Sequence, residues 1–190
     1  MCKAEMVTIY SRGKNDPSLL CSAAIEGLGF ELANAGLGLI YNGCANGLTG
    51  AVAQAVLKNH GQVMAVTTSS AGHVIEEGML CSEQLAVDSM LEGDDEVASR
   101  AMALVVMPGS CSTVEELLDL TKWALSSHQE KLVIVFNLGA SYSVTMAKLV
   151  RRGWEGGISK QVLANIKVVN SVREMMSLLN STRRYVTEVC

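Results

Sequence analysis

Short apolar runs alternate along the chain with longer segments whose apolar residues recur every three or four positions. The short runs are rich in Val, Ile and Leu and do not alternate with polar residues, which is typical of strands buried on both faces of a sheet. In the segment 17–35, Leu20, Ala24, Leu28 and Leu32 lie four apart, which indicates one face of a helix. Strands are expected at 6–11, 37–42, 62–68, 84–89, 103–107, 131–137 and 166–170, and helices at 17–35, 48–59, 92–102, 113–127, 141–152 and 172–180.

The regular succession of strands and helices predicts the fold class. Strand–helix–strand units form parallel sheets with helices on both faces and right-handed crossovers. We therefore expect an α/β protein with a Rossmann-like, doubly wound parallel sheet. The chain contains no linker, repeat or low-complexity segment, so a single domain over residues 1–190 is expected, with a C-terminal tail from about 181 to 190.

Composition narrows the classes of function. The 190 residues carry a net charge of −4 and no basic run, which argues against nucleic-acid binding. No apolar stretch is long enough to span a membrane, and the first ten residues lack the pattern of a signal peptide, so a cytoplasmic protein is expected. The six cysteines include no C-x-x-C pair, so no metal site is expected. Because no export signal is expected, we interpret the cysteines as reduced thiols.

Two glycine-containing loops follow predicted strands at the sheet edge where open parallel sheets bind ligands. The first loop, residues 42–50, reads NGCANGLTG. Glycines allow close approach of the backbone to a ligand, and the free N–H groups of the following helix attract phosphate. The alternative is that the glycines serve only a tight turn. The candidate phosphate-binding residues of this loop are Gly43, Asn46, Gly47 and Thr49.

The second loop, residues 108–116, reads PGSCSTVEE. Thr113 and Glu116 have the spacing of a helix capping box, and Ser112 and Glu115 would fit one register earlier. A helix cap is by itself the favoured role for Glu116. Small residues and hydroxyls at a helix start also suit a phosphate or a sugar. Two such loops at one edge, with a carboxylate nearby, indicate a site for a nucleoside monophosphate. The candidate binding residues of this loop are Gly109, Ser110, Cys111, Ser112 and Thr113.

Both loops, in this order and each followed by a helix, resemble motifs of the LONELY GUY family, whose members were once described as lysine decarboxylases. The family patterns are G-G-G-x-x-G-L-M-G and P-G-G-x-G-T-x-x-E, and the resemblance extends over nearly the whole chain. It implies cleavage of the N-glycosidic bond of nucleoside 5′-monophosphates to a base and ribose 5-phosphate, without a cofactor. It also implies a homodimer, with the helix after PGSCS near the interface.

The resemblance also assigns roles to single residues. Glu116 matches the final glutamate of the motif, and a carboxylate there would stabilise an oxocarbenium-like sugar. The arginine of the family's upstream M-H-E-R-K motif falls on Gly93, and two motif glycines are replaced by Ser110 and Ser112. Arg12, in the loop after the first strand, is the candidate to supply the missing positive charge. The alternative for Arg12 is an ordinary solvated loop residue.

Three hypotheses follow from the sequence. The first is a phosphoribohydrolase with an altered substrate or a reduced rate. The second is a non-catalytic nucleotide-binding or sensing protein of the same fold, and the third is a structural or partner-binding descendant whose loops bind nothing. A lysine decarboxylase is not expected, because no lysine lies beside a glycine loop to carry pyridoxal phosphate.

Overall fold

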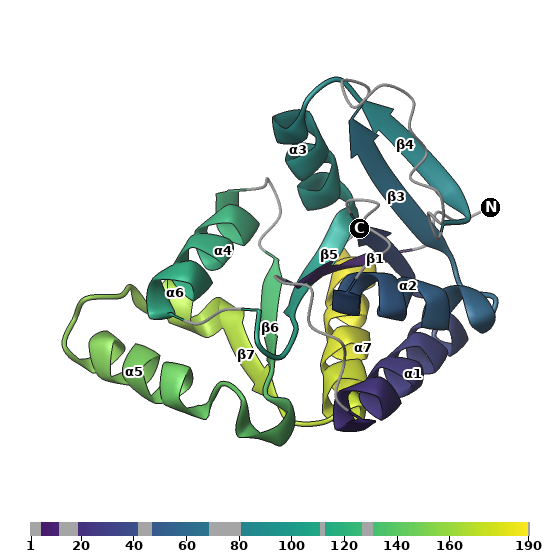
Figure 1. The fold of residues 1–190 in the computed structure, drawn as a ribbon. Helices are drawn as coiled ribbons and strands as arrows, with labels where there is room; N and C mark the ends of the chain where they lie inside the picture. The colour runs from purple at the N-terminus through teal and green to yellow at the C-terminus, as the bar shows by residue number, and fades with distance from the viewer. Residues whose placement is uncertain are drawn as a thin grey trace.

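The computed structural model describes residues 5–11, 19–41, 47–68, 81–110, 113–126 and 131–189, and within them the chain forms a seven-stranded parallel sheet between two layers of helices (Figure 1). The strands are β1 (Met6–Tyr10), β2 (Gly38–Tyr41), β3 (Val63–Thr68), β4 (Glu83–Val87), β5 (Ala101–Val106), β6 (Leu132–Phe136) and β7 (Ile166–Val169). The helices are α1 (Leu19–Asn34), α2 (Gly47–Lys58), α3 (Met90–Arg100), α4 (Val114–Ser126), α5 (Ser143–Trp154), α6 (Lys160–Asn165) and α7 (Val172–Val189), with a short 3₁₀ turn at Leu138–Ala140.

The order of the strands shows where the chain changes direction across the sheet. The order is β4-β3-β2-β1-β5-β6-β7, so the chain first builds outward from β1 and then returns to β5 on its other side. Tyr10 pairs with Val106, and Met107 donates its backbone N–H to the Tyr10 carbonyl at 3.0 Å. The loops after β1 and β5 therefore start side by side at the topological switch point, where doubly wound sheets bind ligands. The predicted fold class is confirmed.

Each face of the sheet has its own apolar core. On one face, α1, α2 and α7 pack over the strands in one large cluster that includes Leu28, Val52 and Leu179. On the other face, α4 and α5 cover β5 and β6, while α3 covers β3 and β4 in a separate cluster. Trp123 of α4 packs against both of these smaller clusters. The sheet is thus buried on both sides, as its unbroken apolar strands predict.

Helices α1 and α2 make an unusually close contact. A Cβ added at Gly29 would lie 2.4 Å from the Cβ of Ala55, closer than real Cβ atoms come to one another. The two helices can approach this closely only because position 29 has no side chain.

The structure differs from the sequence expectation at several boundaries. Strand β4 ends at Val87 rather than at residue 89, and β5 begins at Ala101, where a helix to residue 102 was expected. Helix α3 begins at Met90 rather than at residue 92, because Ser89 caps it by accepting the N–H of Glu92 at 3.2 Å. Helix α6 was not expected. Helix α7 continues to Val189, where a tail from about residue 181 was expected, and Arg183 contacts the Glu5 carboxylate at 2.6 Å.

None of the helices in the described residues is long and apolar enough to cross a membrane.

Candidate functional site

A tight turn carries the chain out of β5 at the switch point. Ser110 donates its backbone N–H to the Met107 carbonyl at 3.1 Å, which closes a four-residue turn. Pro108 and Gly109 occupy its two central positions, and Gly109 has a φ of 75°. Proline followed by a residue with positive φ is the pattern of a type II turn. The glycine of the loop motif is therefore needed for the direction in which the chain leaves the sheet.

Tyr142 holds this turn from the other side of the loop. Its buried hydroxyl donates to the Met107 carbonyl and accepts the Ser110 N–H at 3.0 Å. The backbone N–H of Tyr142 bonds to Oδ1 of Asn137 at 2.7 Å, and Nδ2 of Asn137 bonds to Oδ1 of Asn170 at 3.0 Å. Met107, Asn137 and Asn170 each follow the end of a strand. A polar network therefore connects the carboxyl ends of β5, β6 and β7.

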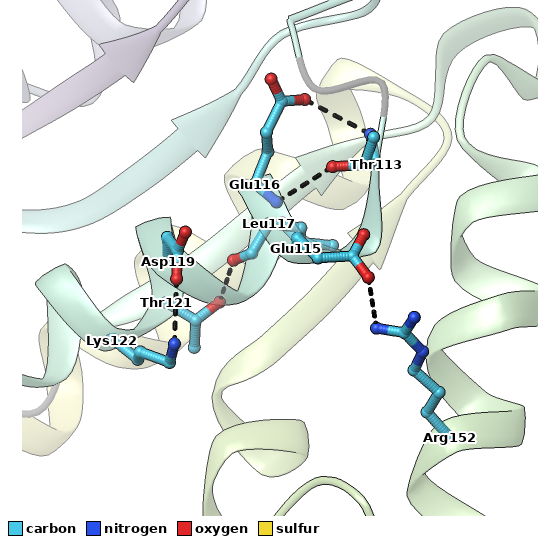
Figure 2. Close-up of polar contacts among 8 residues, drawn as sticks. All are labelled: Thr113, Glu115, Glu116, Leu117, Asp119, Thr121, Lys122 and Arg152. Atoms are coloured by element: carbon cyan, nitrogen blue, oxygen red, sulfur yellow. Dashed lines mark hydrogen bonds and ion pairs between the residues drawn. The ribbon is translucent and has the colours of Figure 1, made fainter.

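The start of α4 has a complete capping box (Figure 2). Glu116 donates its backbone N–H to Oγ1 of Thr113 at 3.2 Å, and Thr113 donates its own N–H to Oε2 of Glu116 at 3.3 Å. This reciprocal pair satisfies two N–H groups that a helix start otherwise leaves without partners. The predicted cap is confirmed, and it also fixes the Glu116 carboxylate beside the turn that follows β5.

The neighbouring carboxylate points elsewhere. Oε1 of Glu115 lies 2.6 Å from the Arg152 guanidinium of α5, and Figure 2 shows the two glutamate side chains directed to different sides of the helix. Hydrogen bonds from its own backbone N–H and from Arg152 lower the pKa of the Glu115 carboxyl. Glu115 is therefore an ionised, paired surface group that connects α4 to α5 through Arg152.

Ser110 is buried at the bend between the turn and α4. Its Oγ is shielded from solvent and has no hydrogen-bond partner among the residues that the structure describes. A buried hydroxyl without a partner costs on the order of 1–3 kcal/mol, so proteins rarely keep one without a reason. This orphaned oxygen lies at the position where the family motif has a glycine.

Gly93, which matches the family's arginine in position, lies on the side of α3 that packs against the sheet. Gly93 is buried in the first turn of this helix. A Cβ added there would lie 3.4 Å from Val87 and 3.5 Å from Val66, so the position faces the sheet. Arg100 ends the same helix and pairs with Glu96 at 2.6 Å, which leaves it at the opposite edge from the glycine loops. No arginine of α3 reaches the site in the described structure.

The predicted site residues fall into three groups. The structure brings Gly109, Ser110, Thr113 and Glu116 together between β5 and α4. Gly47 begins α2 with a φ of 73°, and Thr49 is buried in the same helix at the carboxyl edge of the neighbouring β2. The predicted residues that lie outside the described structure are Arg12, Gly43, Asn46, Cys111 and Ser112.

The fold defines a Rossmann-like protein with a doubly wound parallel sheet, and comparison with known proteins gives the family. A family model described as possible lysine decarboxylase matches residues 49–179. Cytokinin riboside 5′-monophosphate phosphoribohydrolase LOG1 of Arabidopsis thaliana is 31% identical over 157 residues, which cover 83% of this chain and 73% of that protein. The probable cytokinin riboside 5′-monophosphate phosphoribohydrolase LOG4 of Oryza sativa is 33% identical over 159 residues, covering 84% and 68%. The chain belongs to this LONELY GUY family, as its motifs indicated.

Solved structures support the fold. The molybdenum cofactor carrier protein of Chlamydomonas reinhardtii superposes with a TM-score of 0.67 over 96% of this chain and 99% of that chain, at 15% identity. The molybdenum cofactor binding protein of Rippkaea orientalis gives a TM-score of 0.66 over 95% and 98%, at 14% identity. At such identities the likeness concerns the architecture and not the ligand.

Proposed function

We propose that this protein is a phosphoribohydrolase that cleaves the N-glycosidic bond of a nucleoside 5′-monophosphate. The observation that carries the proposal is the Glu116 carboxylate, fixed by its capping box at the start of α4 beside the switch point of the sheet. The names of the relatives support it, and they favour a cytokinin riboside 5′-monophosphate as the substrate.

The chemistry requires a negative group near the anomeric carbon. As the bond to the base breaks, the sugar develops positive charge, and water then adds to C1′ to give ribose 5-phosphate. In this proposal Glu116 stabilises that charge and orients the water, while Arg12 supplies a cation for the phosphate or the departing base. The residues proposed to bind the nucleotide are Gly43, Asn46, Gly47, Thr49, Gly109, Ser110, Cys111, Ser112 and Thr113.

Capping and catalysis are compatible roles for Glu116. A carboxylate that is already held in place needs no reorganisation when charge develops on the substrate, and this preorganisation is a major source of catalysis. The bond from the Thr113 N–H to Oε2 of Glu116 contributes to this preorganisation. The starts of α4 and α2 offer N–H groups and positive dipole ends to the phosphate.

The proposal is tested by incubating the protein with a panel of nucleoside 5′-monophosphates, including cytokinin riboside 5′-monophosphates, and measuring the released base by chromatography. Glu116→Gln keeps the shape of the side chain and its capping bonds, so it should lower turnover about a hundredfold or more while nucleotide binding persists. Glu115→Gln is the matched control, since it removes the same charge one residue earlier in the helix; its turnover should stay within a few fold of wild type. Equal turnover of wild type and Glu116→Gln would exclude Glu116 as the catalytic group.

The second candidate function is a non-catalytic nucleotide sensor of the same fold. Gly93, at the position of the family's arginine, is the observation that favours it. Both functions predict that ribose 5-phosphate raises the melting temperature, because a ligand that binds only the folded state stabilises it. Only the enzyme releases base, so binding without release of base from any member of the panel would identify the sensor.

The proposal includes a cytoplasmic homodimer, as the resemblance and the sequence led us to expect. Support comes from α4, where Leu117 and Ala124 are buried but Leu118, Leu120 and Trp123 are only partly covered within one chain. A partner helix would cover these partly exposed apolar groups. Sedimentation should give a species twice the mass of the 20.2 kDa chain, and a monomer at micromolar concentration would contradict the assembly.

A further inference from the structure

A buried tyrosine from another part of the chain controls the loop that carries the proposed site. We infer that Tyr142 is a positioning residue for the nucleotide. Its hydroxyl accepts a hydrogen bond from the backbone N–H of Ser110, so the hydroxyl of Ser110 is the group that remains to bind the phosphate. The inference rests on the proposed function, and it names a residue that neither loop motif contains.

The backbone N–H of Ser110 is fully used within the protein. Its single N–H is shared between the Met107 carbonyl at 3.1 Å and the Tyr142 hydroxyl at 3.0 Å. One N–H that already has two acceptors has no capacity left for a ligand oxygen. The amide at this position therefore serves the loop and not the substrate.

The side chain of Ser110, in contrast, has a hydroxyl that can still form a hydrogen bond. Its Oγ has no partner among the described residues, although more than nine-tenths of the residue is buried. A phosphate oxygen at the start of α4 would provide the missing acceptor, and hydrogen bonds to a charged group are stronger than neutral ones. The family motif has glycine at this position and so has no hydroxyl to offer. This contact would be particular to chains with serine here.

Tyr142 is held rigidly in place. Its side chain is 1% exposed, its hydroxyl has two partners in the turn, and its backbone N–H is held by Asn137. Asn137 is bonded in turn to Asn170 after β7. A side chain fixed at both ends transmits the position of the sheet edge to the loop, which is the support that a precise binding site requires.

Tyr142→Phe tests the positioning role, with Thr121→Val as the matched control. Thr121 is also fully buried, and its hydroxyl donates to the Leu117 carbonyl at 2.7 Å within α4, away from the turn (Figure 2). Each variant removes one buried hydroxyl that donates to a backbone carbonyl, so each should lower the melting temperature by about 2–4 °C. Calorimetric titration with ribose 5-phosphate is then made at a temperature where all variants are folded.

Tyr142→Phe should bind ribose 5-phosphate about tenfold more weakly and raise KM with little change in kcat, whereas Thr121→Val should bind as the wild type does. Wild-type affinity in Tyr142→Phe, or an equal loss in Thr121→Val, would overturn the inference. Ser110→Ala gives an independent reading if Tyr142→Phe does not fold. It should weaken binding of ribose 5-phosphate but not of the unphosphorylated nucleoside, without lowering the melting temperature, because it removes an unsatisfied hydroxyl.

The two proposals can fail separately. An unchanged affinity of Ser110→Ala for ribose 5-phosphate, or an equal loss for the nucleoside, would refute the role of the hydroxyl. Absence of base release from the wild type would refute the hydrolase while leaving the binding measurements valid. A wild type that does not bind ribose 5-phosphate at millimolar concentration would overturn the inference itself.

Discussion

Two substitutions of Gly93, to alanine and to arginine, test whether the missing arginine limits the activity of the proposed site. An added Cβ would lie 3.4 Å from Val87 and 3.5 Å from Val66, which are ordinary van der Waals distances. Gly93→Ala therefore meets no clash, and it gains about 0.8–1 kcal/mol of helix propensity. We expect the free energy of unfolding to rise by about 1 kcal/mol and the melting temperature by about 2–4 °C.

Gly93→Arg starts from the same Cβ but continues further. The Cα–Cβ bond of a helical residue tilts toward the N-terminus of its helix, and the N-terminus of α3 follows β4 at the carboxyl edge of the sheet. The arginine can therefore run between the sheet and the helix toward the glycine loops. Ordering it costs about 1.5–2 kcal/mol of side-chain entropy, so this variant should be less stable than Gly93→Ala by about that amount.

Urea unfolding and base release, measured on the same two variants, decide the outcome. If the missing arginine limits the rate, Gly93→Arg should turn over at least about tenfold faster than Gly93→Ala, since one preorganised charge is typically worth more than that. A folded Gly93→Arg whose turnover equals that of Gly93→Ala would refute the idea that this position serves the site. A Gly93→Ala variant less stable than wild type would refute the packing argument.

Three further predictions concern stability. Gly29→Ala should lower the free energy of unfolding by more than about 2 kcal/mol in urea titration, because its Cβ would lie 2.4 Å from that of Ala55 and the two helices would have to separate. Burial lowers the pKa of Lys131, so the unfolded chain holds a proton that the folded chain releases. Stability should rise with pH between that lowered pKa and the ordinary lysine value of about 10.4, and Lys131→Met should not show this rise. Arg183→Ala should cost only about 0.5–1 kcal/mol by thermal melting, since its pair with Glu5 is partly exposed.

The sequence predicted the sheet well where burial determines the pattern. The segments that form β1, β3, β5 and β6 are continuous apolar runs. The first and last residues of each strand lie within two positions of the expected ones. The boundary between β4 and α3 differs from the expected one, because Ser89 and Glu92 act through capping bonds that do not alter the apolar pattern. Hydrophobic periodicity also failed at the six-residue α6, which is too short to show a repeat.

The candidate site was predicted as far as local spacing reaches. The capping box of Thr113 and Glu116 is a relation over three residues and was visible in the sequence. The hydrogen bond from Ser110 to Tyr142 joins residues 32 positions apart, and no local pattern indicates it. The burial of Gly93 was equally hidden, because a glycine adds nothing to an apolar pattern, and only the packing of α3 on the sheet shows which way its position faces.

The pairing of β1 with β5 has a consequence for the order in which this protein folds. Met6 pairs with Ala101, so the two strands on either side of the switch point meet only after a long loop of chain has closed. Contacts between distant parts of a chain form slowly and are typical of slow-folding sheets. The loop held by Tyr142 depends on that pairing, so a ligand bound there should contribute little to the folding transition state. A nucleotide should accordingly slow the unfolding of the domain and leave its rate of folding almost unchanged.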